Sequence, residues 1–223
     1  MSEATQLAEA LLKAGTAVIS DVFDNMGLVP LSLATDLWPT RGPGQSFAGP
    51  VFTVAGEMRL GPNKGDRDKL QAIDEMTPGA VALWAGHGMS GVCCFGDLLA
   101  SAMQCRGVAG VVVDGGVRDL AFLRQMELGM LVQYRTPTQA IGRWKVTGWQ
   151  VPVTVRGAVA QSIIVRPGDY LVADDDGAIV VPASLAVGFA GQAAAWEEKD
   201  QGARRDIMAG MKLLDALAKH GAL

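Results

Sequence analysis

Three charged residues follow two apolar stretches of the sequence and could act together on an anionic substrate. Arg118 and Asp119 come directly after the apolar run GVVVDGGV, and Asp97 follows VCCFG. A guanidinium matches the planar geometry of a carboxylate, and carboxylates are ligands that hard divalent cations prefer. These residue types predict chemistry on a small organic acid, provided that the fold brings Asp97 to Arg118 and Asp119.

The segments around these residues alternate between strand-like and helical patterns, which favours parallel strands joined by helical crossovers. Strands are expected at 80–86, 108–114 and 130–134, and helices at 64–76, 96–107 and 118–129. Loops that leave the carboxyl ends of neighbouring parallel strands meet at one crevice. The loops at 86–97 and 114–119 should therefore face one another and bring the three charged residues together.

The flanking segments complete an α/β fold with a mixed sheet. Two short helices are expected at 3–15 and 16–27, followed by irregular structure at 28–44. A strand or strand pair with a bulge at Gly49-Pro50 is expected at 46–58. Further strands are expected at 144–155 and 160–165, and a hairpin at 166–182 around an Asp-Asp-Asp-Gly turn. Gly202 and Gly210 interrupt the helix-prone remainder. We expect one domain over 1–182 and an interface-forming helical arm over 183–223.

Composition narrows the classes of function. Of the 223 residues 49% are hydrophobic and 19% charged, and 19 basic against 23 acidic residues give a net charge of −4. Without a basic block, nucleic acid is not an expected partner. No signal peptide or long apolar run is evident, so we expect a soluble, cytoplasmic protein without a membrane partner. Three cysteines and two histidines do not suit a disulfide framework, a Cys-x-x-Cys zinc site or a Ser-His-Asp triad.

Other motifs have simpler explanations. The stretch GHGMSG (86–91), with Asp114 further along, has the form of a dinucleotide-binding fingerprint, but the next helix begins too late to place its amino terminus at a phosphate. A glycine-rich loop without a nucleotide is the preferred interpretation. Asp97 could equally be a helix cap, and Arg118-Asp119 a surface turn. The seven lysines lie in polar or helical-surface contexts, which disfavours a Schiff-base mechanism.

Four longer segments together carry a resemblance to a known family. FAGPVFTV, PGAVALWAG, GDLLASAMQCRGVAGVVVDGGVRD and GDYLVADDDGAIVVP resemble the RraA-like family, which includes the 4-hydroxy-4-methyl-2-oxoglutarate/4-carboxy-4-hydroxy-2-oxoadipate aldolases and the regulator of ribonuclease E activity. The similarity runs from about residue 7 to residue 200. Its most specific element is Asp97, a gap of twenty residues, and then Arg118-Asp119.

The resemblance implies a swivelling β/β/α fold that assembles as a trimer or hexamer, with active sites at subunit interfaces. It also implies a Mg²⁺- or Mn²⁺-dependent lyase that releases pyruvate from a 4-hydroxy-2-oxo di- or tricarboxylic acid, with oxaloacetate decarboxylation as a side activity. By the same resemblance, Asp119 would bind the metal and Arg118 the keto-acid end of the substrate. The backbone N–H groups of the turn Gly96, Asp97, Leu98 and Leu99 would contact the substrate, and Asp97 would move a proton through water.

The family pattern also extends to the helical arm. An acidic residue of a neighbouring subunit would contact the metal through water, and Glu197 is the expected residue, with Glu198 as the alternative. Two segments depart from the aldolases, the apolar LAFL after Asp119 and the tail after Gly210, and they leave the substrate open. The rival hypothesis is a protein-binding regulator resembling the ribonuclease E inhibitor, with little or no catalysis.

Overall fold

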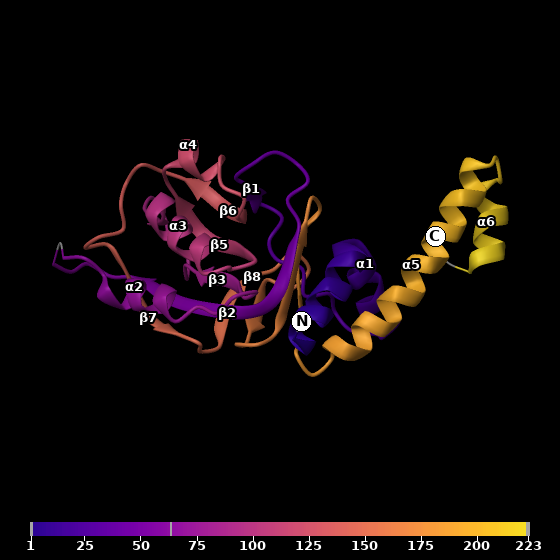
Figure 1. The fold of residues 1–223 in the computed structure, drawn as a ribbon, viewed down its shortest axis with the longest axis horizontal. Coiled ribbons are helices and arrows are strands. Elements are labelled where there is room, and N and C mark those ends of the chain that lie inside the picture. Colours follow the sequence, from indigo (N-terminus) through magenta and orange to yellow (C-terminus); the bar gives the residue numbers. More distant parts are fainter. Residues whose placement is uncertain (1, 63, 222–223) are drawn as a thin grey trace.

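A mixed sheet forms the body of the molecule, and a helical arm extends from one end of it (Figure 1). The computed structural model describes residues 2–62 and 64–221. In these residues nine strands pair in the order β1-β6-β5-β3-β2-β10-β11, with β4 also beside β5 and β7 also beside β2. Strands β8 and β9 form a separate two-stranded sheet. The α/β fold with a mixed sheet and C-terminal helices is confirmed.

The helices and strands have the following bounds. The helices are α1 Glu3–Asn25, α2 Arg67–Asp74, α3 Asp97–Cys105, α4 Leu120–Leu123, α5 Ala186–Met208 and α6 Leu213–His220. The strands are β1 Trp38–Pro39, β2 Phe47–Met58, β3 Val81–Ala85, β4 Cys93–Phe95, β5 Gly110–Val117, β6 Gly129–Arg135, β7 Trp144–Trp149, β8 Val153–Arg156, β9 Ser162–Val165, β10 Tyr170–Asp174 and β11 Gly177–Val181.

The long strand β2 joins the two halves of the sheet. Its first residues pair antiparallel with β10, its middle pairs parallel with β3, and its end pairs antiparallel with β7. Parallel pairing continues from β3 to β5 and from β5 to β6, as the alternating pattern predicted. The carboxyl ends of these central strands therefore lie along one edge, where the candidate residues are found.

Three apolar clusters hold this arrangement together. One lies between the sheet and α2 and α3 and includes Trp84 and Met103, and a second lies between the sheet and the β8-β9 pair. The third packs α1 and α5 against β10 and β11, with the rings of Phe23 and Phe189 4.5 Å apart. Burial of such side chains removes apolar surface from water and supplies most of the stabilisation.

Several expected elements differ in extent. The two N-terminal helices form the single element α1, kinked at Gly15, whose φ of 82° suits glycine. The strand expected at 46–58 forms as the single strand β2, but its register shift lies at Ala55-Gly56 opposite β7 and not at Gly49-Pro50. The helix expected at 118–129 is only the four residues of α4. The strand expected to end at residue 114 continues to Val117. The short strand β4 was not predicted, because glycines precede it and only three residues form it.

The C-terminal arm is helical, as expected, and points away from the sheet (Figure 1). The first part of α5 packs on α1, whereas exposed apolar side chains, among them Met208 and Leu214, lie near its far end and on α6. Gly210 breaks the arm as predicted; Gly202 does not and lies within α5. The division into 1–182 and 183–223 stays a prediction. No helix of the described residues is long and apolar enough to cross a membrane.

The Asp-Asp-Asp-Gly turn of the β10-β11 hairpin also anchors the kink of α1. Asp174 Oδ2 accepts from the Thr16 N–H at 2.8 Å, and Asp174 Oδ1 accepts from the Thr16 hydroxyl at 2.7 Å and from the Asp176 N–H at 3.0 Å. The turn was expected, but its bonds to a helix more than 150 residues away in sequence were not, because single-residue contacts of this kind leave no periodic pattern.

We expect Asp174→Ala to lower the free energy of unfolding by about 2 kcal/mol, because hydrogen bonds to a charged group each contribute on the order of 1.5–3 kcal/mol. Urea denaturation followed by circular dichroism would measure the change. Asp176→Ala is the matched control, since its exposed side chain lies in the same turn. Equal stability of Asp174→Ala and Asp176→Ala would contradict this anchoring role.

Candidate active site

Pairing of β4 with β5 brings the predicted residues together. The two strands are parallel, with Cys93 opposite Gly116 and Phe95 opposite Val117. Gly96 and Asp97 follow β4, and Arg118 and Asp119 follow β5, so both pairs leave neighbouring strand ends. The convergence expected from the sequence is therefore correct, but the strand responsible is β4 rather than the strand at 80–86.

A close contact at Gly96 fixes the two loops to each other. The Asp97 N–H donates to Asp119 Oδ2 at 3.4 Å, and the Arg118 N–H donates to the Phe95 carbonyl at 3.1 Å. A Cβ atom at position 96 would lie 2.6 Å from Asp119 Oδ2 and 3.3 Å from Arg118 Cγ. Glycine leaves room for the Asp119 carboxylate beside the start of α3, and a side chain at position 96 would require Asp119 to shift.

Asp119 and Arg118 interact directly at the mouth of this turn. Arg118 Nε lies 3.3 Å from Asp119 Oδ2, and the two side chains are 44% and 33% exposed. Asp119 adopts a left-handed conformation with φ of 61°, a region that aspartate, asparagine and histidine enter more often than other residues with a side chain. This conformation places the Asp119 carboxylate against the Asp97 N–H.

The first turn of α3 supplies backbone donors. Asp97 Oδ1 accepts from the Leu98 N–H at 2.8 Å, so the Asp97 side chain caps the helix locally. The first N–H groups of a helix have no acceptor within it, and the positive end of the helix dipole favours anions there. The Leu99 N–H is therefore suited to an oxyanion of a ligand, with Arg118 close by.

A cavity of about 230 Å³ opens at these residues. All six residues singled out for substrate and metal from residues 96–119 line it: Gly96, Asp97, Leu98, Leu99, Arg118 and Asp119. The other walls come from α2 and from the segment 139–141. The volume suits a small organic acid.

Lys69 of α2 also lines this cavity, and the sequence analysis missed it. Its Nζ donates to the Cys94 carbonyl at 3.1 Å and lies 5.1 Å from the centre of the Trp144 ring. Burial lowers the pKa of Lys69, and the nearby Arg118 charge lowers it further. The expectation that every lysine lies in a polar or surface context is wrong here. The signal was the spacing of Lys69 with Ala72 and Ile73, which turns its stem toward the core.

The cysteines beside Lys69 are thiols rather than nucleophiles. Burial raises the pKa of Cys94 to about 12 and also raises the pKa of Cys93, which lines the cavity. A protonated thiol is a poor ligand for a cation. The anionic donors that line the cavity are therefore carboxylates, Asp97 and Asp119 together with Asp66.

Carboxylate oxygens fit a hard divalent cation such as Mg²⁺, which keeps much of its water shell and takes one or two protein carboxylates. Among the described residues no cluster of three or more His, Cys, Asp or Glu side chains could hold a metal ion. One chain thus offers a partial set of ligands around Asp119, which suits a hydrated ion and does not suit a closed protein cage.

Glu197 does not lie at this site within one chain. It lies on α5, where its Oε1 accepts from the Gln201 side chain at 2.8 Å. In Figure 1 the arm and α3 lie at opposite ends of the molecule. A contact of Glu197 or Glu198 with Asp119 would therefore have to come from a second chain, as the sequence analysis expected, and stays a prediction.

The glycine-rich loop at 86–91 leads into β4 rather than into a helix, as expected for a loop without a nucleotide. Asp114 lies inside β5, not at its end, and its carboxylate accepts from Arg156 Nε at 2.9 Å. Arg156 also binds Asp36, so this ion cluster joins β5 to the small sheet. Asp114 is thus part of the scaffold and not of the candidate site.

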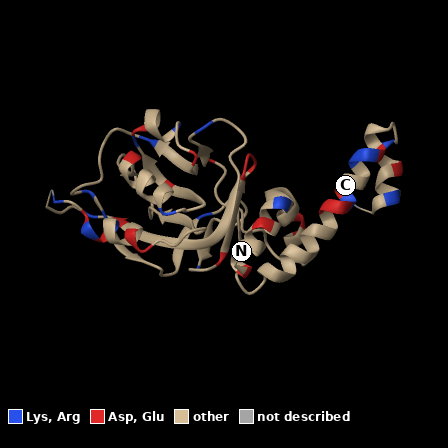
Figure 2. Cartoon of the chain, viewed as in Figure 1, with Lys and Arg blue, Asp and Glu red and all other residues tan. Residues whose placement is uncertain are grey.

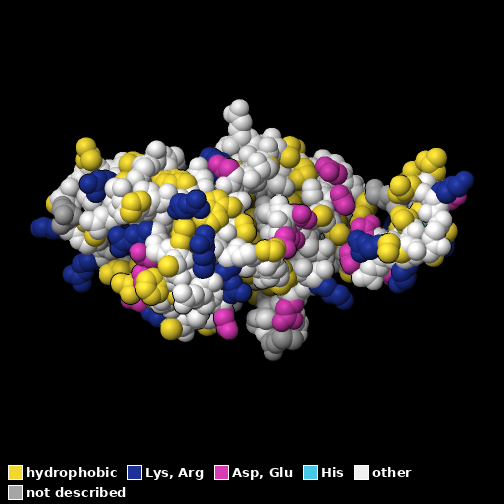
Figure 3. Space-filling model, turned by 90° about the horizontal axis from the view of Figure 1, so that it is seen from above, with side chains coloured by type: hydrophobic (Ala, Val, Ile, Leu, Met, Phe, Trp, Pro, Cys, Tyr) yellow, Lys and Arg dark blue, Asp and Glu magenta, His cyan; other side chains and the backbone are white. Residues whose placement is uncertain are grey.

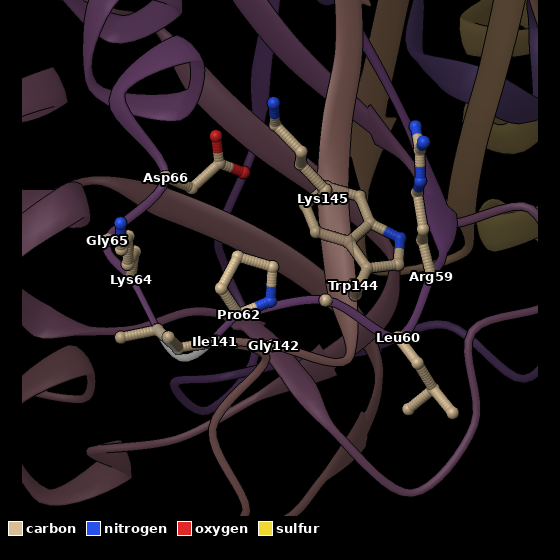
Figure 4. A pocket seen from close by; sticks show the side chains of 11 residues that line it. Arg59, Leu60, Pro62, Lys64, Gly65, Asp66, Ile141, Gly142, Trp144 and Lys145 are labelled. Carbon is tan, nitrogen blue, oxygen red and sulfur yellow. The ribbon is translucent and has the colours of Figure 1, made fainter.

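A second, larger cavity of about 390 Å³ adjoins the first and shares Gly65, Asp66 and Ile141 with it. Figure 4 shows the side chains of Arg59 and Lys145 in this cavity, pointing in the same direction with the Trp144 ring between them. Lys145 is paired with Asp68 at 3.1 Å. Its positive charge is therefore partly neutralised, unlike that of Lys69.

Charge is unevenly distributed over the molecule. Basic side chains are frequent around α2 and the neighbouring loops (Figure 2), and Figure 3 shows Lys and Arg mainly over that half and Asp and Glu mainly over the half of α1 and α5. Acidic residues of α2 and its start, among them Asp66, Asp68 and Asp74, lie between the basic ones, so charges of both signs surround the two cavities.

The fold and site define a family. Residues 16–180 match the family model RraA-like: Aldolase/RraA, and the chain belongs to this family. A 4-hydroxy-4-methyl-2-oxoglutarate aldolase of Thermus thermophilus is 30% identical over 173 residues, which are 77% of this chain and 94% of that protein.

Two further relatives show how widely the fold is used. The crystal structure of Streptomyces coelicolor RraAS2, an unusual member of the RNase ES inhibitor RraA protein family, superposes with a TM-score of 0.75 at 26% identity and covers 89% of this chain and 96% of that one. Protein DlpA of Legionella pneumophila is 24% identical over 79% of this chain, but the match spans only 27% of DlpA. The relatives thus include an aldolase and an inhibitor of RNA processing.

Proposed function

We propose that this protein is a divalent-metal-dependent lyase, a class II aldolase that releases pyruvate from a 4-hydroxy-2-oxo di- or tricarboxylic acid. Oxaloacetate decarboxylation is the expected side activity. The observation that carries the proposal is the meeting of the Asp119 carboxylate, the Arg118 side chain and the start of α3 around Gly96, at the wall of one cavity. The similarity to the Thermus aldolase supports the choice of substrate class.

Each residue has a defined task in this reaction. Arg118 binds the carboxylate next to the keto group, for which its planar guanidinium is suited. Asp119, with water, would hold Mg²⁺ or Mn²⁺, and this ion would supply electrostatic stabilisation for negative charge on a keto oxygen. The Leu99 N–H at the start of α3 is available to stabilise the same developing charge, whereas the Leu98 N–H already donates to Asp97 Oδ1.

The bond changes balance as follows. The substrate's 4-hydroxyl loses its proton, the bond between C3 and C4 breaks, and its electron pair becomes the enolate of pyruvate while C4 becomes a carbonyl. Asp97 takes the hydroxyl proton through a water, and a proton returned to C3 completes pyruvate. In oxaloacetate the bond to the 4-carboxylate breaks instead, carbon dioxide leaves, and the same enolate is protonated.

The proposal includes assembly of several copies, a trimer or hexamer, in which the arm of one chain brings Glu197 to the metal waters of another. The exposed apolar side chains on the arm support this part of the proposal, because such surfaces are usually covered.

A regulatory function is the second candidate. The similarity to Streptomyces coelicolor RraAS2, an unusual member of the RNase ES inhibitor RraA protein family, favours it. Such a protein would bind its partner and release no pyruvate. Turnover in the purified protein therefore separates the two functions.

Chelation should abolish pyruvate release, and added Mg²⁺ or Mn²⁺ should restore it, because one carboxylate and water hold an ion weakly. Asp119→Asn should fold and assemble normally yet lose at least about a hundredfold in kcat/KM, since the charge that binds the ion is gone. A coupled lactate dehydrogenase assay would measure both effects. Chelator-resistant turnover, or an active Asp119→Asn variant, would refute the metal assignment.

Arg118→Lys should lower kcat/KM by at least about tenfold, because it keeps the charge but loses the two-pronged contact with a carboxylate. Arg124→Lys is the control, a change of the same type at the end of α4. Saturation kinetics with a 4-hydroxy-2-oxo diacid would measure the loss. Near-normal kinetics of Arg118→Lys would mean that Arg118 is only structural.

Light scattering should return three or six times the chain mass of 23.3 kDa. Replacing Leu213 and Leu214 by Ser should shift the protein toward smaller species, because both side chains are exposed on the arm. Val187→Ser, exposed at the start of α5, is the control. A wild-type monomer at micromolar concentration would exclude a contribution of Glu197 to a neighbouring site.

A further inference from the structure

Lys69 is a cation without a carboxylate partner at the wall of the candidate cavity. The ion pairs among the described residues do not include Lys69; its Nζ donates to the neutral Cys94 carbonyl and lies over the Trp144 ring. A partly buried charge is costly unless it is paired. An anionic ligand in the cavity would supply the missing partner.

The carboxylate nearest in sequence is already occupied. Asp66 caps α2, where its Oδ1 accepts from the Lys69 N–H at 3.4 Å, and its Oδ2 accepts from the Val146 N–H at 2.9 Å. Asp66 thus fixes the backbone of Lys69 and the start of β7, and its oxygens are directed at backbone N–H groups. The Lys69 ammonium remains free to bind a ligand.

The position of Lys69 differs from that of Arg118. Lys69 Nζ binds the carbonyl of Cys94, whereas the Arg118 backbone binds the carbonyl of the next residue, Phe95. Carbonyls of consecutive strand residues point in opposite directions. The two cationic residues therefore approach β4 from opposite sides, Lys69 from α2 and Arg118 from β5, and both line one cavity.

We propose that Lys69 is a specificity residue that binds the distal carboxylate of the substrate, the one remote from the keto group, while Arg118 binds the keto-acid end. The identity of the substrate in this inference rests on the proposed function, whereas the pairing of the Lys69 ammonium with a carboxylate does not. It assigns the cavity to acids with two anionic ends and predicts discrimination against acids with one.

The lowered pKa of Lys69 is consistent with this role. Burial is the main cause that disfavours its ammonium; the Asp66 charge favours the ammonium and the Arg118 charge disfavours it, and a bound carboxylate would favour it further. The Lys69 Nζ lies over the ring of the buried Trp144, 5.1 Å from its centre, so this ring and the Cys94 carbonyl hold the ammonium at the cavity wall. A preorganised cation of this kind binds an anion with little loss of side-chain entropy.

Two unreactive acids of equal length test the proposal. 2-Oxoglutarate and 2-oxopentanoate both have five carbons and a 2-oxo acid end, and they differ in a carboxylate against a methyl group. Isothermal titration calorimetry with Mg²⁺ present would measure both affinities. We expect wild type to prefer 2-oxoglutarate by at least about tenfold, the effect of one charge-assisted hydrogen bond.

Lys69→Met keeps an apolar stem on Trp144 and removes the charge. It should abolish the preference for 2-oxoglutarate and change the affinity for 2-oxopentanoate less than about twofold, as expected when one contact is lost. Lys69→Arg should retain part of the preference. Lys145→Met is the matched control in the adjoining cavity and should change neither affinity. Should Lys69→Met fail to fold, Lys69→Gln takes its place in the same titrations.

The outcomes separate this inference from the proposed function. If the wild type releases no pyruvate but still prefers 2-oxoglutarate through Lys69, the proposed lyase function is wrong and the anion site stands. A wild type that binds neither acid, or binds both equally, would overturn the inference, as would equal losses for both acids in Lys69→Met or loss of the preference in Lys145→Met. A pyruvate adduct trapped on Lys69 by borohydride would make it a covalent residue and also overturn the inference.

Discussion

The parallel pairing of β4 with β5 is the interaction on which the candidate site depends. It places the residue after Phe95 beside the residue after Val117, so that a helix start and a left-handed aspartate meet over a glycine. Each remaining feature of the site follows from this contact: the direction of Arg118, the free donors of α3 and the opening of the cavity. Glycines in β5 make the pairing feasible, because a Cβ at Gly116 would lie 2.4 Å from the Val92 carbonyl.

The same arrangement divides recognition between two ends of a ligand. Arg118 and Asp119 follow a sheet strand and are fixed by its backbone, whereas Lys69 comes from a helix that Asp66 ties to β7. Chemistry and selectivity would then depend on different elements. A change in α2 or in the adjoining cavity could alter which acid is bound without moving the groups that act on its keto end.

Much of this organisation could be predicted from the sequence. The parallel core was predicted from the apolar runs at 80–86 and 108–114 and the amphipathic stretches between them. The meeting of Asp97 with Arg118 and Asp119 was predicted because loops that follow neighbouring parallel strands converge. β4 was missed because three residues carry no period. α4 is short because the chain turns after Leu123, where the N–H groups of Gln125 and Met126 bond three residues back. Lys69 was missed because a lysine on an amphipathic helix was taken as solvent-facing, although its spacing with Ala72 and Ile73 places its stem on the apolar side. Contacts of Glu197 with another chain involve a partner on which a single sequence carries no direct information.

The absence of a side chain at position 96 has a consequence for how this family can diverge. The turn leaves no space for even one methyl group, because that group would take the place of an Asp119 oxygen 2.6 Å away. The sheet, the apolar clusters and the helical arm make no use of this space. One nucleotide change at the codon for position 96 could therefore displace the Asp119 carboxylate in a protein that still folds. Under the proposed lyase function, such a variant would lose turnover and keep its surfaces for binding.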